Sequence, residues 1–403
     1  MARQRIAVVG AGIVGLAIAD RLRQVEPEAE LTVLEKETEV AQHQTSHNSG
    51  VVHAGVYYVP GSLKAALCRR GVSLLKDYCE HRQIPYQECG KLIVAADDSE
   101  TARLDEIERH AVANGVPGLR RLAGGEITAC EPHVRGVSAL HSPRTAIVDF
   151  QAVARALADD LVDSGAELRL GFQVAAIRES AREVRIRSAT GSELAVDRLI
   201  VCAGLHSDRL ARLAGDGAAP WIVPFRGEYY RLVPDRRALV RGLIYPVPDP
   251  AYPFLGVHFT RRIDGQVDIG PGAVLALARE GYRRTDLAPG DVWQTLASRG
   301  FRRLARTHWR AGLRELHGSL SRRSFLAGAQ RLIPSLDSRD VVRAPAGVRA
   351  QAVGADGSLL DDFQITERGN LVFVRNAPSP AATSSLAIAE YVVGRLRDAP
   401  AAR

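Results

Sequence analysis

The sequence predicts a mixed fold that is α/β in one part and α+β overall, and three observations support this prediction. The chain opens with a short apolar strand, a glycine-rich turn and a helix, which is the pattern of a parallel sheet with helical connections. Segments in the middle of the chain, such as Glu228 to Leu232 and Gln266 to Gly270, alternate as antiparallel strands do. A further strand, loop and helix close the chain. With 403 residues, the chain is long enough for about two domains.

The first unit has the order expected of a Rossmann-type nucleotide site. Arg5 to Val9 is predicted to form a buried strand, Gly10-Ala11-Gly12-Ile13-Val14-Gly15 a turn, and Leu16 to Gln24 a helix. Gly10 permits the tight turn, Gly12 lets the backbone approach a pyrophosphate, and Gly15 lets the helix pack closely on the strand. A second strand, Leu31 to Glu35, ends in a carboxylate suited to ribose hydroxyls. The unit therefore predicts a dinucleotide site.

The far end of the chain favours FAD over NAD as that dinucleotide. Asn370 to Val374 is predicted as a strand, and it is followed by the small-residue loop 375–385 and an apolar helix, Leu386 to Leu396. A loop at a helix start offers amide donors to a second part of a long cofactor. Arg198 to Gly204 is predicted as another strand that meets a glycine turn. Nucleotide-type elements spread over the whole chain suit an extended FAD in a discontinuous domain.

Composition narrows the class of partner and the setting. The formal charge is +7, but the arginines are scattered, and the densest region, Arg302 to Arg323, lacks interleaved aromatic residues for base stacking. We therefore expect no nucleic-acid partner; an RNA-binding flavoprotein would show strongly salt-dependent affinity. A peripheral membrane contact is compatible with this basic region. Five cysteines without a C-x-x-C pair predict a reducing, cytoplasmic setting. With the peripheral membrane contact, the chain would lie at the inner face of the cell membrane.

The segment after the first unit, His43 to Tyr58, is polar and glycine-rich and carries three histidines. We expect no metal site there, because the histidines lie on a loop without a nearby acidic ligand. The run HQTSHNSGVVHAGVYYVPGSLKAALCRRG resembles the L-2-hydroxyglutarate dehydrogenase/oxidase family of FAD enzymes. The same resemblance extends over most of the chain, through CGKLIVA (89–95), PFRGEYYRL (224–232), LIYPVPDPAYPFLGVHFTRRIDG (243–265), PAGVRAQAV (345–353) and NAPSPAATSSLAI (376–388).

This resemblance implies a D-amino-acid-oxidase-like fold, with a Rossmann-type FAD domain that is discontinuous in sequence and an antiparallel-sheet substrate domain. The FAD domain is predicted over 1–85, 150–218 and 342–403, and the substrate domain over 86–149 and 219–341. The residues predicted to bind the cofactor are Gly10, Gly12, Ile13, Val14, Gly15, Glu35, Lys36, Thr45, His47, Asn48, Ser49, Gly50, Val174, Ala203, Gly204, Asn376, Ala377, Pro378, Ala381, Thr383 and Ser384.

The implied reaction is oxidation of L-2-hydroxyglutarate to 2-oxoglutarate, with electrons passing to oxygen or a quinone. The hydroxyl proton needs a base, and His53 is predicted for this role because histidine titrates near working pH. The 1-carboxylate favours an arginine, since a guanidinium binds carboxylates in a bidentate manner. Arg349 is predicted for this role because the motif around it resembles that of related amine oxidases, in which the arginine holds the substrate carboxylate. His258 is an alternative base or carboxylate ligand. An amino-acid oxidase of the same fold is the alternative function; it needs no histidine base.

Further substrate-binding residues are less specific in the sequence. Arg226 assists at the carboxylate or pairs with Glu228 instead. The candidates for the distal carboxylate are Tyr57, Lys64, Tyr245 and Arg261. The segment Asp291 to Leu316 is predicted to be helical, and we expect its regularly spaced apolar residues to lie in the core.

Overall fold

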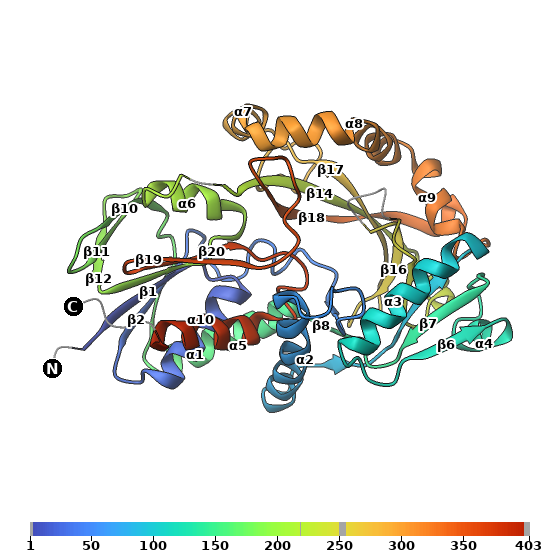
Figure 1. The fold of residues 1–403 in the computed structure, drawn as a ribbon, viewed down its shortest axis with the longest axis horizontal. Helices are drawn as coiled ribbons and strands as arrows, with labels where there is room; N and C mark the ends of the chain where they lie inside the picture. The colour runs from blue at the N-terminus through green and yellow to red at the C-terminus, as the bar shows by residue number, and fades with distance from the viewer. Residues whose placement is uncertain (1–2, 218, 250–254, 399–403) are drawn as a thin grey trace.

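The computed structural model describes residues 3–217, 219–249 and 255–398. The part of the 243–265 motif from 250 to 254 lies outside the described residues. Two large sheets lie side by side, with the chain termini at the far side of the first (Figure 1). The model confirms the mixed α/β fold predicted from the sequence. The domain boundaries themselves stay a prediction.

The first sheet has six strands in the order β19-β20-β13-β1-β2-β9. Every neighbouring pair is parallel except β19 and β20. The predicted strand Arg5–Val9 is confirmed as β1, at the centre of this sheet. The remaining strands are β2 (Glu30–Leu34), β9 (Glu167–Arg169), β13 (Arg198–Val201), β19 (Gln364–Arg368) and β20 (Leu371–Asn376).

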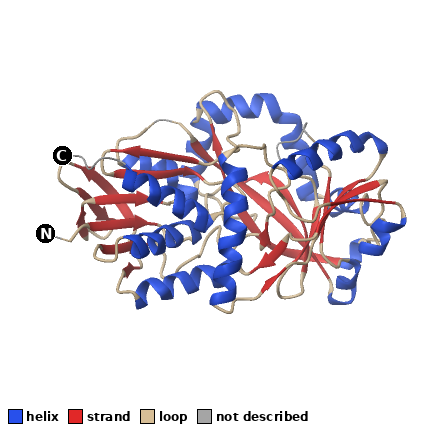
Figure 2. Cartoon of the chain, turned by 60° about the horizontal axis from the view of Figure 1, so that its bottom comes forward, coloured by secondary structure: helices blue, strands red, loops and turns tan. Residues whose placement is uncertain are grey.

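Both faces of the six-stranded sheet are covered, because β1 is apolar on both sides. Ile6 and Val8 pack against one layer of helices, while Ala7 and Val9 pack against the other face. The first layer consists of α1 (Ile13–Val25), α2 (Leu63–His81), α5 (Phe150–Asp163) and α10 (Ser385–Asp398) (Figure 2). The second face carries α6 (Ser207–Leu213) and a three-stranded sheet of β10 (Val174–Glu179), β11 (Val184–Ser188) and β12 (Glu193–Val196).

The second large sheet has eight strands in the order β18-β14-β17-β16-β15-β5-β7-β6. Only β15 and β5 run parallel; the other neighbours are antiparallel, as predicted for this part of the chain. Its strands are β5 (Lys91–Ala95), β6 (Arg120–Ala123), β7 (Ser138–Ser142), β14 (Trp221–Leu232), β15 (Leu243–Pro246), β16 (His258–Arg261), β17 (Val267–Leu275) and β18 (Val341–Val353). β18 comes from the C-terminal third of the chain, so chain segments from both sides of the predicted boundary meet in this sheet.

Smaller elements complete the fold. A short sheet joins β3 (Val51–Val52), β8 (Ala146–Val148) and β4 (Tyr86–Gln87), and it anchors the loop that follows the first unit. Helices α3 (Thr101–Ala113) and α4 (Gly125–Cys130) accompany the eight-stranded sheet (Figure 1). Among the described residues, no helix has both the length and the apolar character needed to cross a membrane.

The expectation that the apolar residues of 291–316 lie in the core is wrong for most of them. This segment forms α7 (Pro289–Ala297) and most of α8 (Arg299–Leu320), which lie along the outer side of the eight-stranded sheet with α9 (Arg322–Gln330) following (Figure 1). Leu304 is buried, but a set of large apolar residues is exposed: Trp293, Leu296, Trp309, Leu313 and Leu316. Helical periodicity shows which side chains share a face, and it does not show whether another element covers that face.

Candidate active site and cofactor-binding site

The glycine turn between β1 and α1 has the geometry that a dinucleotide needs. Gly10 has a positive φ of 105°, and a Cβ there would overlap the carbonyl of Cys202. A Cβ on Gly15 would overlap the carbonyl of Gly10, so this glycine allows the close packing of helix on strand. A Cβ on Gly12 would meet only the Thr45 hydroxyl, at 3.4 Å. The fold therefore does not require a glycine at position 12, and the space at the start of α1 is left for a ligand.

Glu35 lies directly after β2, and its carboxylate is positioned by the backbone. Its Oε2 accepts a hydrogen bond from Ala11 N at 2.7 Å, and its Oε1 accepts one from Glu37 N at 3.0 Å. Phe172 N donates to the Glu35 carbonyl at 2.7 Å, which brings the start of β10 with Val174 close to this acid. Ile13 N, at the first turn of α1, donates to Thr45 Oγ1 at 3.1 Å. Glu35 thus lies beside the glycine turn, where a ribose would be held.

The C-terminal loop 377–384 reaches the same edge of the sheet. Strands β1, β2, β13 and β20 all end there, so Gly10, Glu35, Gly204 and Asn376 lie at the carboxyl ends of parallel strands, where α/β sheets bind ligands. Among the described residues, buried polar atoms without a partner flank this loop on both sides: Oδ1 of Asn376 at the end of β20, and the hydroxyls of Ser384 and Ser385 where the loop enters α10. Such orphaned atoms are expensive unless a ligand satisfies them.

These features fit FAD. The open space at Gly12, a carboxylate for ribose and buried unsatisfied hydroxyls at a second helix start would hold an extended dinucleotide. The other residues predicted to bind it lie on the same turn, the same strand ends or the two loops 45–50 and 377–384: Val14, Ser49, Gly50, Ala203, Ala377, Pro378, Ala381 and Thr383. Their individual contacts with the cofactor stay a prediction.

Internal hydrogen bonds shape the loop 43–50. Asn48 Nδ2 donates to the Thr45 carbonyl at 2.6 Å, and Asn48 Oδ1 accepts from Gly50 N at 2.8 Å. His47 stacks on Tyr282, with ring centroids 4.0 Å apart. Tyr282 comes from the segment between β17 and α7. The loop is therefore fastened both to itself and to the half of the molecule that carries the eight-stranded sheet.

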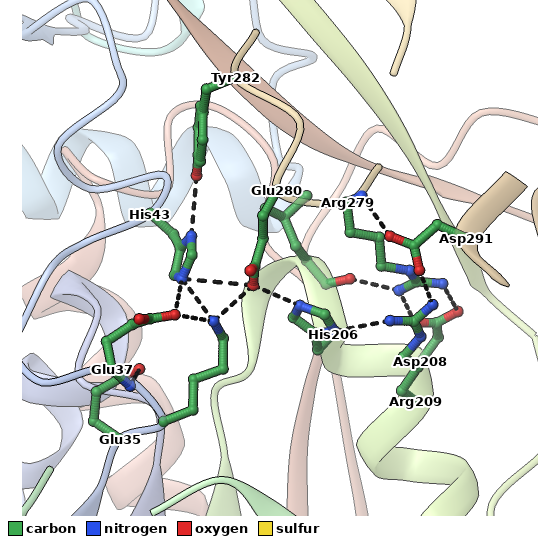
Figure 3. A network of polar contacts seen from close by, with 12 residues as sticks. Glu35, Glu37, His43, His206, Asp208, Arg209, Arg279, Glu280, Tyr282 and Asp291 are labelled. Atoms are coloured by element: carbon green, nitrogen blue, oxygen red, sulfur yellow. Dashed lines mark hydrogen bonds and ion pairs between the residues drawn. The ribbon is translucent and has the colours of Figure 1, made fainter. Parts of the chain in front are cut away.

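A polar network continues this attachment (Figure 3). Glu37, His43 and Glu280 are the one group of potential metal ligands found among the described residues. Lys36 Nζ lies among them, 2.7 Å from Glu280 and 2.8 Å from His43 Nε2, and it also pairs with Glu37. An ammonium thus already occupies the position that a metal ion would take. Lys36, predicted as a cofactor residue, is engaged in this network.

His53 lies where the loop after the first unit meets the C-terminal loop. Its backbone N–H donates to Thr383 Oγ1 at 3.1 Å, and its Nε2 is 3.3 Å from Ser379 Oγ. Burial lowers the pKa of His53 well below the usual 6.5, and the nearby charges of Lys91, Lys64 and Arg349 lower it further. The imidazole is therefore neutral at physiological pH and able to accept a proton.

A group of aromatic and cationic residues surrounds His53. His258 stacks on Tyr245 with ring centroids 4.0 Å apart, and its Nδ1 is 2.8 Å from the Gly256 carbonyl. Burial lowers the pKa of His258 to about 3, with Lys91 and Arg349 contributing. The side chain of Arg349 is exposed, yet desolvation lowers the pKa of its guanidinium. A side chain can be accessible to solvent and still be largely desolvated where protein surrounds it on most sides. The model thus brings together His53, His258, Tyr245 and Arg349.

Other predicted substrate residues have protein partners. Arg226 is buried and pairs with Glu228 at 2.9 Å, the alternative that the sequence left open. Lys64 Nζ pairs with Asp361 at 2.7 Å, although its charge still acts on His53. Arg261 ends β16 and donates to the Arg241 carbonyl at 3.4 Å. Tyr57 and Tyr245 both lie against Lys91, and the buried hydroxyl of Tyr57 has no hydrogen-bond partner in the part of the chain that the structure describes.

Sequence reasoning missed three residues of this region. Ser379 Oγ lies close to His53 Nε2, and the ammonium of Lys91 lies over the ring of Tyr245. The charge of Arg349 acts on the pKa of the third residue, Tyr229. Only Lys91 had a usable signal: it opens the apolar run Leu92-Ile93-Val94-Ala95, in which every residue is buried. A lysine in such a strand is unusual, because lysine is almost never fully buried unless it is paired.

Comparison with known proteins places the fold and site in a family. The model of the family described as FAD dependent oxidoreductase matches residues 5–395. The chain belongs to this family of FAD-dependent oxidoreductases, and FAD is its cofactor.

Within the family, the chain is similar to L-2-hydroxyglutarate dehydrogenases. It is 44% identical to the mitochondrial enzyme of Homo sapiens, over 97% of this chain and 88% of that protein. It is 43% identical to the enzyme of Escherichia coli (strain K12), over 97% of this chain and 92% of that protein. These similarities confirm the predicted resemblance.

Solved structures confirm the fold. An L-alpha-glycerophosphate oxidase from Mycoplasma pneumoniae with FAD bound superposes with a TM-score of 0.79 at 22% identity, covering 99% of this chain and 96% of that one. Glycine oxidase from Geobacillus kaustophilus superposes with a TM-score of 0.70 at 19% identity, covering 98% and 96%. At these identities, the comparison supports the fold alone.

Proposed function

We propose that this chain oxidises L-2-hydroxyglutarate to 2-oxoglutarate. The observation that carries the proposal is the identity of 43–44% to dehydrogenases of that substrate over 97% of the chain. The site agrees with it, because a neutral, buried histidine lies among cations and would receive an anionic hydroxy acid. The chemistry that FAD supplies when bound is acceptance of the Cα hydride at flavin N5.

The residues of this chain would supply the remaining steps. Arg349 would fix the 1-carboxylate and thereby orient the Cα–H bond. His53 would take the hydroxyl proton at Nε2, the nitrogen that faces Ser379 Oγ. The substrate then loses one proton and one hydride, which together convert the alcohol to a ketone. The low pKa of His53 favours the neutral, accepting form before this transfer.

The test is substitution of His53 by alanine. We expect turnover of L-2-hydroxyglutarate to fall by about 10²- to 10⁴-fold, the usual contribution of a positioned general base. FAD content and the oxidised flavin spectrum should remain those of the unmodified enzyme, since the contact of residue 53 with Thr383 is made by its backbone. Turnover of L-2-hydroxyglutarate close to that of the unmodified enzyme would remove His53 from the mechanism.

The electron acceptor of the proposed reaction is oxygen or a quinone, and an exposed surface bears on the choice. Helices α7 and α8 expose Trp293, Trp309 and Leu313, with 73%, 55% and 57% of their surfaces accessible. Arginines 299, 302, 303, 306 and 310 accompany them on α8. An apolar face flanked by cations is typical of helices that lie on anionic membranes. This surface supports a peripheral membrane contact, and with it a quinone acceptor.

Sedimentation with lipid vesicles tests this contact. Vesicles that contain an anionic lipid should bind the enzyme, and the double variant Trp309→Glu/Leu313→Glu should bind at least about tenfold more weakly, because two apolar side chains are replaced by anions. Val112→Glu, at an equally exposed apolar position on α3, is the control. Equal vesicle binding by the double variant and the control would contradict a contact through α8.

A further inference from the structure

Lys91 is a buried cation, and no described residue is its anionic partner. It is the first residue of β5, and only 2% of its surface is accessible. Among the described residues, its ammonium has neither an ion pair nor a hydrogen bond. It lies over the ring of Tyr245 at 4.2 Å and over that of Tyr57 at 5.3 Å. Burial is the main effect on the pKa of this amine and lowers it to about 8, so the group is still mostly charged at neutral pH.

The strand register directs Lys91 to the face that carries the other site residues. Lys91 is paired with Leu243 and Ile93 with Tyr245 in the parallel ladder of β5 and β15. Lys91 and Tyr245 are therefore two residues apart in the register, on one face of the sheet. Tyr245 in turn stacks on His258 of β16. Lys91, Tyr245 and His258 thus form a row across three neighbouring strands.

Other cations act on this row. The charge of Lys91 acts on both His53 and His258, and the charge of Arg349 acts on the same two histidines. The two histidines therefore lie within the fields of both cations. The groups that affect the pKa of Lys91 include the thiols of Cys68 and Cys89 but no carboxylate. Asp361, an acid that acts on Arg349, is mostly exposed and pairs with Lys64.

A purely structural role does not explain why a charged residue is buried at position 91. A cation–π contact offsets part of the cost of burying an ammonium, but a methionine or leucine would pack between the tyrosines without any such cost. Buried charges are otherwise paired. The unpaired ammonium, the orphaned Tyr57 hydroxyl beside it and the excess of positive charge together indicate that an anion completes this site.

We propose that Lys91 binds the distal carboxylate of the substrate, while Arg349 holds the carboxylate next to the hydroxyl, so that Lys91 selects hydroxydicarboxylates over hydroxymonocarboxylates. This inference rests on the proposed function and specifies which residue recognises its substrate class. Tyr57 supplies a hydrogen bond from its unpartnered hydroxyl to the same carboxylate. The substrate then lies between the two cations, with its hydroxyl at the histidines.

The test measures binding of two unreactive acids to the oxidised FAD-loaded enzyme. Glutarate carries two carboxylates and pentanoate carries one on a chain of the same length; perturbation of the flavin absorbance reports their dissociation constants. The unmodified enzyme should prefer glutarate. Lys91→Met should weaken the binding of glutarate by about 30-fold or more, which is the usual effect of removing one partner of a buried charge pair. The binding of pentanoate should be unchanged or tighter. Lys76→Met, at a surface lysine paired with Glu88, is the matched control.

The outcomes separate the two proposals. Glutarate binding by Lys91→Met with the affinity of the control would overturn the role of Lys91, as would an unmodified enzyme that does not prefer glutarate. An enzyme that fails to oxidise L-2-hydroxyglutarate, but whose preference for glutarate disappears with Lys91, would overturn the proposed function and leave the dicarboxylate site standing. Lys91→Gln repeats the measurement with a polar neutral side chain, should Lys91→Met fail to fold and retain FAD.

Discussion

At the scale of single residues, the site is defined by cations that lie close to two desolvated histidines. His53 and His258 are kept neutral by burial and by the cations around them, so both can act as proton acceptors or hydrogen-bond partners. Arg349 and Lys91 keep their charge in surroundings that disfavour it. This arrangement costs stability in the absence of an anion, and it is the feature that ties the residue chemistry to an anionic substrate.

The loss of folding stability caused by burying the Lys91 ammonium can be measured. The pKa of Lys91 in the folded protein is about 8, below its ordinary 10.5, so between these two pH values the unfolded chain holds a proton that the folded chain has released. The free energy of unfolding therefore rises with pH in this window. At pH 7, Lys91→Met should raise it by about 2 kcal/mol, the burial cost less the lost cation–π contact.

Denaturant unfolding of the substrate-free protein checks this expectation at several pH values. The advantage of Lys91→Met should shrink as the pH rises from about 8 to 10.5, because the lysine then becomes neutral in the unmodified protein too. A variant less stable than the unmodified protein at pH 7 would show that the ammonium is stabilised by the protein itself, and not kept for an anion.

At the scale of elements, the turn between β1 and α1 contains glycines that the fold requires and one glycine that the ligand requires. A methyl group on Gly15 would overlap the carbonyl of Gly10, whereas one on Gly12 would touch only the Thr45 hydroxyl. We expect Gly15→Ala to lower the stability of the FAD-free protein, because helix and strand must separate. Gly12→Ala should leave that stability nearly unchanged but weaken FAD binding by at least about tenfold.

Thermal melting of the FAD-free proteins and titration with FAD, followed by flavin fluorescence, distinguish the two glycines. If Gly12→Ala binds FAD as the unmodified protein does, the pyrophosphate does not pass over this turn. If Gly15→Ala melts at the temperature of the unmodified protein, the close packing of α1 on β1 is not required.

The elements also show how far sequence reasoning extends. The first unit was predictable because its signals are local: a strand, a glycine turn, a helix and an acid follow one another directly, and β1 and α1 agree with the prediction. The exposure of Trp309 and Leu313 was not predictable, because it depends on which distant element covers α8. Lys91 was missed for a related reason: its partners Tyr57 and Tyr245 come from two other segments of the chain.

At the scale of the whole molecule, function requires that distant segments meet. His53 from the first part of the chain contacts Ser379 and Thr383 from the last part. The Lys36–Glu280 pair and the stacking of His47 on Tyr282 fasten the cofactor side to the side of the eight-stranded sheet. The cofactor site and the cation-rich group of residues around His53 therefore belong to one assembled structure, and neither sheet alone contains a complete site.

The most direct test of the central claim is an anaerobic titration of the FAD-loaded enzyme with the two enantiomers of 2-hydroxyglutarate. Without oxygen or a quinone, a substrate that gives up its hydride leaves the flavin reduced, and its visible absorbance disappears. We predict that L-2-hydroxyglutarate bleaches the flavin stoichiometrically and yields 2-oxoglutarate, while D-2-hydroxyglutarate does not bleach it. An enzyme that keeps its yellow colour with the L enantiomer would contradict the account.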